Sequence, residues 1–292
     1  MASSIPVIVV VGPTASGKTG RAIKLAQRYN GEVICADSRT VYKGMDIGTA
    51  KPLAQEQAGV SHWGLDLVLP IDRYTVAEFK RYADNKITEI KGRGKVPIIV
   101  GGTGLYVDAV IFDYQFPLPM SDEDRVHFEN LPRSELIDYC LKNNIELPVD
   151  DKNTRRLLRT INDPYGSRQR RSAPKSNTII VGIATNKTTL KQRIMERTEH
   201  MFENGVVDEA TLLGKKYGWN AEAMTSNVYQ VIRTYLSGGQ TLENTKEIFT
   251  TRDIQLAKRQ MTWFRRNPYV EWAELPEVEH YVASALASEY NL

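Results

Sequence analysis

The sequence has few of the residues that build disulfide frameworks and metal clusters. Its 292 residues include two cysteines, Cys35 and Cys140, and four histidines. Two cysteines exclude a disulfide framework, and this low content is compatible with a reducing cytosol. No second histidine or cysteine stands at metal-ligand spacing from His62, so we expect His62, with Trp63 beside it, to be structural.

The sequence also lacks long apolar runs and a large excess of charge of one sign. No window approaches the roughly eighteen apolar residues of a membrane span, and the N-terminal Met-Ala-Ser-Ser-Ile-Pro has no charged region followed by an apolar segment. The net charge of +3 is only a weak indication of a polyanionic partner. We therefore expect a cytoplasmic protein with no targeting signal and no membrane partner.

One strong motif stands near the start of the chain. The apolar run Val7-Ile-Val-Val-Val11 precedes a phosphate-binding (P-loop) pattern, G-x-x-x-x-G-K-[ST], and residues 21–29 resemble a helix. The backbone N–H groups of such a loop surround an anion, the lysine adds a mobile charge, and the threonine hydroxyl can bind Mg²⁺. A Gly-rich turn that merely joins strand to helix is the alternative. We expect Thr19 at the metal and a diphosphate bound by Gly12, Pro13, Thr14, Ala15, Ser16, Gly17, Lys18 and Thr19.

Strands and helices alternate through the first part of the chain. Residues 32–36 and 95–100 are apolar runs typical of buried strands, and residues 75–91 have helical spacing that begins with the capping box Thr75-Val-Ala-Glu78. This alternation predicts an α/β fold with a parallel sheet, here a P-loop core.

The pattern changes from about Asp113 to short, charged helical segments, and an apolar run at residues 177–184 then returns to a strand. We expect a helical insertion over residues 113–176 within a core formed by residues 1–112 and 177–292. Residues 165–175 are polar and interrupted by Gly and Pro, which is typical of a mobile loop. Further helices are expected at residues 190–204, 207–217, 227–236 and 254–266.

Two strand ends carry candidate catalytic residues. Asp37 ends the strand that we expect beside the phosphate loop, at the edge where open α/β sheets bind ligands. It could accept a proton as a general base, or it could hold the Mg²⁺ shell. Thr103 stands among Gly101, Gly102 and Gly104, which could serve a tight turn or a close approach to phosphate.

Basic residues are concentrated on one predicted helix, on the insertion and near the end of the chain. Arg193 and Arg197 share one helix face, so they could clamp a leaving diphosphate or could be solvated. Basic residues interleaved with aromatic ones suit a phosphate backbone and unstacked bases, and together they favour a nucleic-acid partner. These residues are Arg155, Arg156, Arg159, Arg168, Arg170, Arg171 and Lys175, then Lys258, Arg259, Arg265 and Arg266 around Trp263 and Phe264.

Successive motifs over most of the chain occur together in one known family. They are residues 12–19, 36–39 with 41–42, 44–52, 74–79, 101–106, 156–159 and 256–265. In these motifs the chain resembles the tRNA dimethylallyltransferases. That family is an α/β P-loop core with a helical insertion, and it moves a dimethylallyl group from its diphosphate to the exocyclic amine of the adenine just 3′ of the anticodon.

The resemblance implies roles for particular residues. Asp37 would be the general base, and Thr103 and Arg197 would hold the diphosphate and the reaction centre, with Arg193 at the diphosphate. The implied ligands are dimethylallyl diphosphate, Mg²⁺ and a tRNA anticodon stem-loop, and we expect a monomer. The implied tRNA contacts are Asp37, Ser38, Arg39 and Thr40 in one loop and Arg155, Arg156, Leu157, Leu158 and Arg159 on one helix.

The chain departs from the family pattern in three places. It has Thr40 where the family usually has Gln, His62-Trp63 where it has a His pair, and Val228-Tyr229-Gln230 where it has a Gly-Tyr-Arg/Lys stretch. Gln can form two hydrogen bonds with an adenine and Thr cannot, so Thr40 changes the contacts on the adenine side.

Three other functions compete with this interpretation. An isopentenyltransferase that acts on free adenine nucleotides would share the motifs without a tRNA-binding face. A small-molecule kinase would use the P-loop for ATP, with residues 168–171 in a lid. A non-catalytic RNA-binding switch would use it for a nucleotide.

Overall fold

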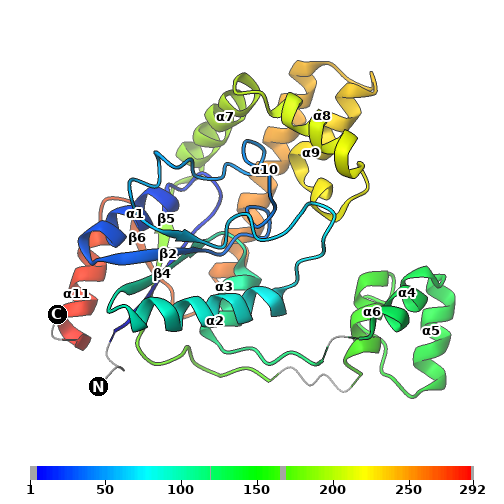
Figure 1. Cartoon of the computed structure of the whole chain (residues 1–292), viewed down its shortest axis with the longest axis horizontal. Coiled ribbons are helices and arrows are strands. Elements are labelled where there is room, and N and C mark those ends of the chain that lie inside the picture. Colours follow the sequence, from blue (N-terminus) through cyan, green and yellow to red (C-terminus); the bar gives the residue numbers. More distant parts are fainter. Residues whose placement is uncertain (1–4, 119, 165–168, 291–292) are drawn as a thin grey trace. The chain divides into compact units, whose positions relative to one another are not determined.

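The structure is a computed structural model that describes residues 5–118, 120–164 and 169–290 (Figure 1). It divides into two compact units. The first comprises Met1–Ile111 and Pro174–Leu292, and the second is Phe112–Ala173, which is the region of the expected insertion.

A six-stranded parallel sheet forms the centre of the first unit. Its strand order is β3-β2-β4-β1-β5-β6, and every pair of neighbours is parallel. The predicted α/β fold with a parallel sheet is therefore confirmed. The strands are β1 (Val7–Val11), β2 (Gly31–Cys35), β3 (His62–Trp63), β4 (Val96–Gly101), β5 (Thr178–Ala184) and β6 (Glu271–Glu274).

The sheet order corrects one expectation about Asp37. The strand that precedes it, β2, does not pair with β1, because β4 lies between them. The strands β2 and β4 are both largely apolar and buried, so hydrophobic pattern alone does not determine which of them becomes the neighbour of β1.

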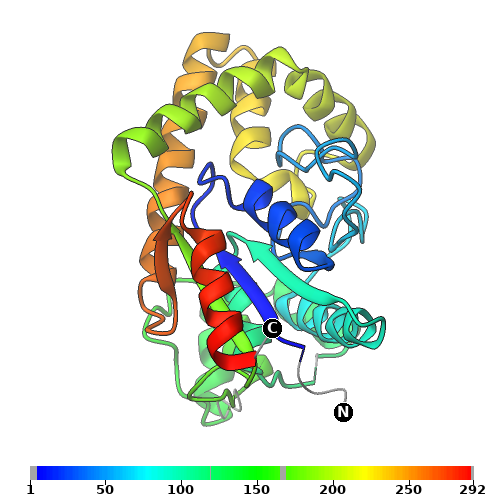
Figure 2. The ribbon, with the colours of Figure 1, turned by 90° about the vertical axis from the view of Figure 1, so that its left-hand side faces the viewer.

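Helices cover the sheet and extend beyond its carboxyl edge. Buried residues of α1 and α11 share one hydrophobic core with β1 and β5, whereas α7 to α10 form a second core and gather beyond the strand ends (Figure 2). The helix α10 begins earlier than the sequence predicted, because the Thr241 hydroxyl accepts a hydrogen bond from the Asn244 N–H. The helices are α1 (Lys18–Arg28), α2 (Val76–Gly92), α3 (Gly104–Ile111), α7 (Lys187–Glu203), α8 (Val206–Tyr217), α9 (Asn227–Leu236), α10 (Leu242–Phe264) and α11 (Val278–Tyr290), with a 3₁₀ turn at Glu222–Thr225.

Within its described residues, the second unit contains helices and no strand. Its elements are α4 (Asp122–Asn130), α5 (Arg133–Lys142) and α6 (Thr154–Asn162). They enclose a small core of Phe128, Leu136, Cys140, Leu157 and Ile161. Residues 165–168, which include Arg168 and begin the expected mobile loop, lie outside the described residues.

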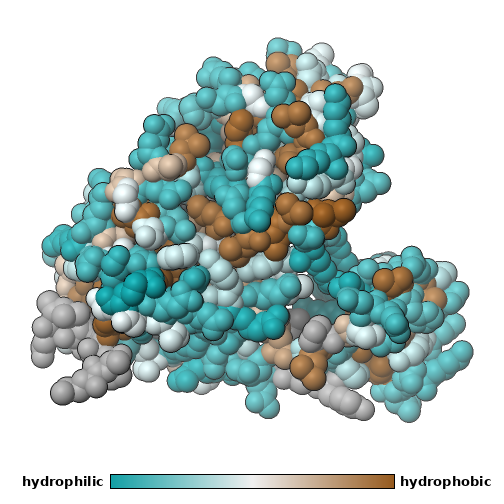
Figure 3. All heavy atoms as spheres, viewed as in Figure 1, coloured by the Kyte–Doolittle hydropathy of each residue, from teal (hydrophilic) through white to brown (hydrophobic). Residues whose placement is uncertain are grey.

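The outer surface is mostly hydrophilic on the face drawn in Figure 3, where a band of hydrophobic side chains also crosses the middle. Large exposed apolar side chains include Leu53, Leu69 and Ile71, from the loops between β2 and α2. Over the described ranges, no helix combines the length and the apolar character needed to cross a membrane.

A buried carboxylate joins the edge of the sheet to α2. Glu32 on β2 accepts hydrogen bonds from Trp63 Nε1 at 2.7 Å and Arg93 Nη2 at 2.7 Å, and its carboxylate lies 3.0 Å from Lys95 Nζ. Burial alone would raise its pKa, but the bonds from Arg93, Trp63 and Lys95 outweigh that effect and lower the pKa to about 2. Trp63 is therefore structural, as the sequence predicted.

This cluster predicts a pH-dependent loss of stability. The pKa of Glu32 is lower in the folded state than in the unfolded state. Its contribution to the free energy of unfolding is therefore complete above the ordinary pKa of 4.5 and is lost as the pH falls toward about 2. We expect Glu32→Gln to lower the free energy of unfolding at neutral pH by on the order of 3 kcal/mol, measured by urea denaturation.

The difference in the free energy of unfolding between Glu32→Gln and the parent should decrease as the pH falls from 4.5 toward 2. Glu247→Gln, which changes an exposed side chain on α10, is the matched control and should unfold like the parent. Equal denaturation midpoints for Glu32→Gln and the parent at neutral pH would contradict a stabilising role for the Glu32 carboxylate.

Candidate active site

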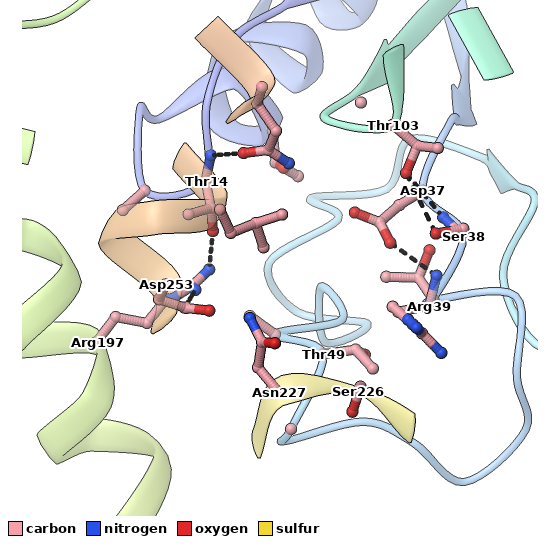
Figure 4. Close-up of a pocket in the computed structure, with 18 of the residues that line it drawn as sticks. Thr14, Asp37, Ser38, Arg39, Thr49, Thr103, Arg197, Ser226, Asn227 and Asp253 are labelled. Carbon is pink, nitrogen blue, oxygen red and sulfur yellow. Dashed lines mark hydrogen bonds and ion pairs between the residues drawn. The ribbon is translucent and has the colours of Figure 1, made fainter. Parts of the chain in front are cut away.

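One cavity of about 460 Å³ lies at the carboxyl edge of the sheet in the first unit (Figure 4). Its walls come from the phosphate loop, the ends of β2 and β4, residues 48–52, the start of α9, and the helices α7 and α10. Segments that are far apart in sequence therefore face one space.

The phosphate loop has the backbone that an anion site requires. Gly17 is the N-cap of α1 and has φ 86°, a left-handed conformation that favours glycine, and Ala15 has φ 59°. The start of α1 can then present unpaired N–H groups to a ligand. Lys18 Nζ donates to Pro13 O at 3.1 Å. Burial lowers the pKa of Lys18 to about 8 although Asp37 opposes the shift, so the side chain remains mostly charged at neutral pH.

Two helices hold this loop from the outside. Arg197 on α7 donates to the Thr14 hydroxyl and to the Asp253 carboxylate on α10. On the same helix α10, Gln260 Oε1 accepts the Thr14 N–H at 2.8 Å. Arg197 is therefore not part of a solvated helix face.

The neighbouring Arg193 also reaches the phosphate loop. Its Nη1 lies 3.5 Å from Ser16 O, so the structure brings both arginines of the predicted pair to the same loop. Charged groups of the protein thus gather where the sequence predicted a diphosphate.

Asp37 and Thr103 lie on the opposite side of the cavity. Asp37 Oδ1 accepts the Arg39 N–H at 2.8 Å, and the carboxylate points toward the cavity (Figure 4). Thr103 Oγ1 accepts the Ser38 N–H at 3.0 Å, which joins the ends of β2 and β4. A carboxylate and a hydroxyl therefore face the phosphate loop across one space.

Thr40 also lines this wall, but it offers little to a ligand. Its side chain is 6% exposed and its hydroxyl oxygen is buried, without a partner among the described residues. A polar contact from Thr40 to a ligand is therefore not prepared in this structure.

Atoms of other residues pack against the glycines near Thr103, in the space that a side chain would occupy. A Cβ on Gly101 would collide with the Ala36 carbonyl, one on Gly102 with the Gln260 side chain, and one on Gly104 with the Trp263 ring. Packing thus accounts for these glycines, and the alternative of a close approach to phosphate is not needed.

Packing also fixes the aromatic pair on α10. Trp263 Nε1 donates to Asp108 Oδ2 at 2.7 Å, and Phe264 is 1% exposed. Phe264 lies in the protein core, so it is not one of the aromatic side chains of this basic segment that could stack on a base.

Glu209 is a residue that the sequence analysis missed. From α8 it accepts the N–H groups of Asp46, Ile47 and Gly48 at 2.7–2.8 Å and the Tyr229 hydroxyl at 2.7 Å. It therefore ties the loop that supplies residues 48–52 to α9, and so joins two walls of the cavity. The chain separates these partners so widely that no sequence pattern relates them.

The predicted tRNA-binding helix is α6 of the second unit. Arg155, Arg156 and Arg159 are exposed on it, with Arg156 Nε 3.8 Å from Asp150 Oδ2. Leu157 is fully buried and Leu158 packs against the same core, so these two side chains support the helix.

The residues available for a metal are few. Over the described residues, no group of three or more His, Cys, Asp or Glu side chains could hold a metal ion. Thr19 and Asp37 both line the cavity and offer oxygen atoms, the donors that Mg²⁺ prefers. Burial raises the pKa of Cys35 to about 12, so its thiol offers no thiolate ligand.

Comparisons with known proteins point to one family. A family model described as IPP transferase matches residues 40–267, and one described as isopentenyl transferase matches residues 5–67. The tRNA dimethylallyltransferase of Acetivibrio thermocellus is 37% identical, with 94% of this chain and 93% of the relative covered. That of Bacillus subtilis is 34% identical, with 92% and 91% covered.

Solved structures give the same result. The tRNA isopentenylpyrophosphate transferase of Bacillus halodurans has a TM-score of 0.75 and 34% identity, with 97% of both chains covered. A eukaryotic dimethylallyltransferase described as acting on tRNA has a TM-score of 0.77 and 25% identity, with 96% of this chain and 77% of that chain covered. The chain therefore belongs to the tRNA dimethylallyltransferase family of prenyl-transferring enzymes.

Proposed function

We propose that this protein transfers the dimethylallyl group of dimethylallyl diphosphate to the exocyclic amine of the adenine 3′-adjacent to the anticodon in tRNA, and releases diphosphate. The observation that carries the proposal is the single cavity in which a phosphate loop faces a strand-end carboxylate. Membership of the family supports the same reaction.

The diphosphate would lie in the phosphate loop. The N-terminus of α1, Lys18 and Arg197 supply positive charge there, and Arg193 stands behind the loop. Positive charge at this position stabilises the negative charge that grows on the leaving group.

Mg²⁺ fits the same end of the cavity. The Thr19 hydroxyl, which lines the cavity beside the phosphate loop, would hold it. When bound, the ion would contribute Lewis-acid stabilisation of the leaving diphosphate.

The acceptor amine would approach from the side of Asp37. Its nitrogen forms a bond to the first carbon of the dimethylallyl group while the bond from that carbon to oxygen breaks, and the bonding electrons leave with the diphosphate. Asp37 takes one proton from the amine, since an aromatic amine is a poor nucleophile until it loses that proton. The Thr103 hydroxyl, fixed by Ser38, would orient the reacting groups.

The tRNA would contact the enzyme at Ser38 and Arg39 beside the cavity and at the exposed arginines of α6. Its target nucleotide must leave the base stack of the anticodon loop to reach the cavity. We further propose that the enzyme works in the cytoplasm as a monomer.

Acceptor competition tests this function. The protein would be incubated with labelled dimethylallyl diphosphate and one of three acceptors: an anticodon stem-loop RNA, AMP or ATP. The proposal expects label in the RNA alone. Label in AMP or ATP would support an isopentenyltransferase of free nucleotides, and transfer of the ATP γ-phosphate would support a kinase.

Asp37→Ala is expected to lower the turnover of RNA by about 10²–10⁴-fold, because general-base loss has effects of this size. Binding of dimethylallyl diphosphate, measured by calorimetry without metal, should change little. Glu247→Gln serves as the control for carboxylate loss elsewhere. Turnover by Asp37→Ala within a few-fold of the parent would exclude Asp37 as the base.

Replacement of Arg155, Arg156 and Arg159 together by Ala should weaken tRNA binding and its salt dependence. Each phosphate contact releases counterions, so loss of three contacts should reduce the slope of log affinity against log salt by about 2–3. The affinity would be measured by filter binding at several salt concentrations.

Lys142→Ala, which removes an exposed charge from α5 of the same unit, is the matched control. Affinity for dimethylallyl diphosphate should stay at the parental value in both variants. Equal slopes and equal tRNA affinities for the triple variant and the parent would remove these arginines from the tRNA interface.

A further inference from the structure

The cavity contains an amide side chain that the reaction above does not use. Asn227, the first residue of α9, lines the cavity, and its amide points into the space between the Arg197 side and the Asp37 side (Figure 4). Within the described part of the chain, no hydrogen bond engages this amide. It is therefore available to a ligand in both of its roles, as donor and as acceptor.

The other amides near this wall each use one atom in a hydrogen bond within the protein. Gln230 Nε2 donates to Met224 O at 2.8 Å, and Gln260 Oε1 accepts the Thr14 N–H at 2.8 Å. Thr40, whose hydroxyl is buried, cannot replace an amide. Asn227 thus has the open amide of the cavity wall.

The backbone that carries Asn227 is firmly held. Val228 and Tyr229 follow it in the hydrophobic core and are 1% and 0% exposed, and the Tyr229 hydroxyl donates to Glu209. The turn before α9 receives weak bonds from Arg39 Nη1, which lies 3.4 Å from both Glu222 O and Ala223 O. The backbone from which the Asn227 side chain extends is therefore fixed, which favours selective recognition.

We propose that Asn227 recognises the acceptor adenine through its N6 amine and its N7 atom. Asn227 Oδ1 would accept one N–H of the amine, and Nδ2 would donate to N7, the pairing by which amide side chains select adenine. A base with a keto oxygen in place of the amine would put two acceptors against each other. This inference rests on the proposed function, because it names the residue that selects the acceptor in that reaction.

The pairing is compatible with the chemistry at Asp37. The amine has two hydrogens, one on the N1 side and one on the N7 side. Asp37 takes the proton on the N1 side as the new carbon–nitrogen bond forms, and Asn227 keeps its bond to the other hydrogen throughout. The residue is thus a specificity determinant and takes no part in the bond changes.

Substitution at this position gives the first test. Asn227→Ala and the isosteric Asn227→Asp should each lower kcat/KM for the stem-loop RNA by about 10–100-fold, the range of a two-bond base contact. The KM for dimethylallyl diphosphate should not change. Asn244→Ala, which removes an exposed amide from α10, should behave like the parent.

Acceptor analogues identify the contacted atoms. With RNA that carries 7-deazaadenosine at the target position, the activity of the parent should fall below its activity on the adenosine RNA. The activity of Asn227→Ala should differ little between the two RNAs, because this variant makes no bond to N7. With 1-deazaadenosine, the ratio of parent to variant should stay as it is for adenosine. Circular dichroism would verify that each variant is folded.

Other results would overturn the inference. Parental kcat/KM in folded Asn227→Ala and Asn227→Asp would exclude a role for the amide, and an increased KM for dimethylallyl diphosphate would place it at the other substrate. If Asn227→Ala lowered kcat/KM by the same factor on the adenosine and the 7-deazaadenosine RNA, a contact between Asn227 and N7 would be excluded. Failure of the parent to prenylate any adenine acceptor would instead contradict the proposed function.

Discussion

The active site depends on the contacts that hold the phosphate loop between two helices. Arg197 of α7 bonds the Thr14 hydroxyl and Asp253, while Gln260 of α10 accepts the Thr14 N–H. A loop with unpaired N–H groups can bind an anion well only if its backbone is already in place, since otherwise binding must also order the loop. These contacts supply that order and bring the Arg197 guanidinium to the loop at the same time.

The opposite wall is ordered by a second set of buried polar contacts. Glu209 accepts hydrogen bonds from the loop at Asp46, Ile47 and Gly48 and from Tyr229 of α9. The nearby Lys51, 8% exposed, pairs with Asp46 and Asp66. The cavity is thus enclosed by two preorganised walls, one suited to a diphosphate and the other to a base. This division explains how a phosphate loop can serve carbon–oxygen cleavage without phosphoryl transfer.

The sequence predicted the features whose physics is local. The phosphate loop follows from glycines and a lysine at fixed spacing, and the capping box at Thr75 and Glu78 is present as expected. Asp37 and Thr103 follow the ends of strands, so the sequence predicted them at the carboxyl edge of the sheet, where open α/β sheets bind ligands. The helical region between 113 and 176 was predicted from short, charged helical segments with no strand pattern among them.

Features that depend on distant partners could not be predicted. The position of β4 between β1 and β2 follows from tertiary packing, and so do the contacts made by Glu209 and the glycines beside Thr103. Asn227 resembles an ordinary helix start in the sequence, because only the assembled cavity shows that its amide has no hydrogen-bond partner among the described residues.

The central claim is that this phosphate loop holds a leaving group whose bond to carbon breaks. A heavy-oxygen label at the atom that joins the dimethylallyl carbon to phosphorus tests it most directly. After reaction with the anticodon stem-loop RNA, mass spectrometry should find the dimethylallyl group on adenine and all of the label in the released diphosphate. Label that stays with the prenyl group, or a phosphate transferred to the RNA, would contradict the account.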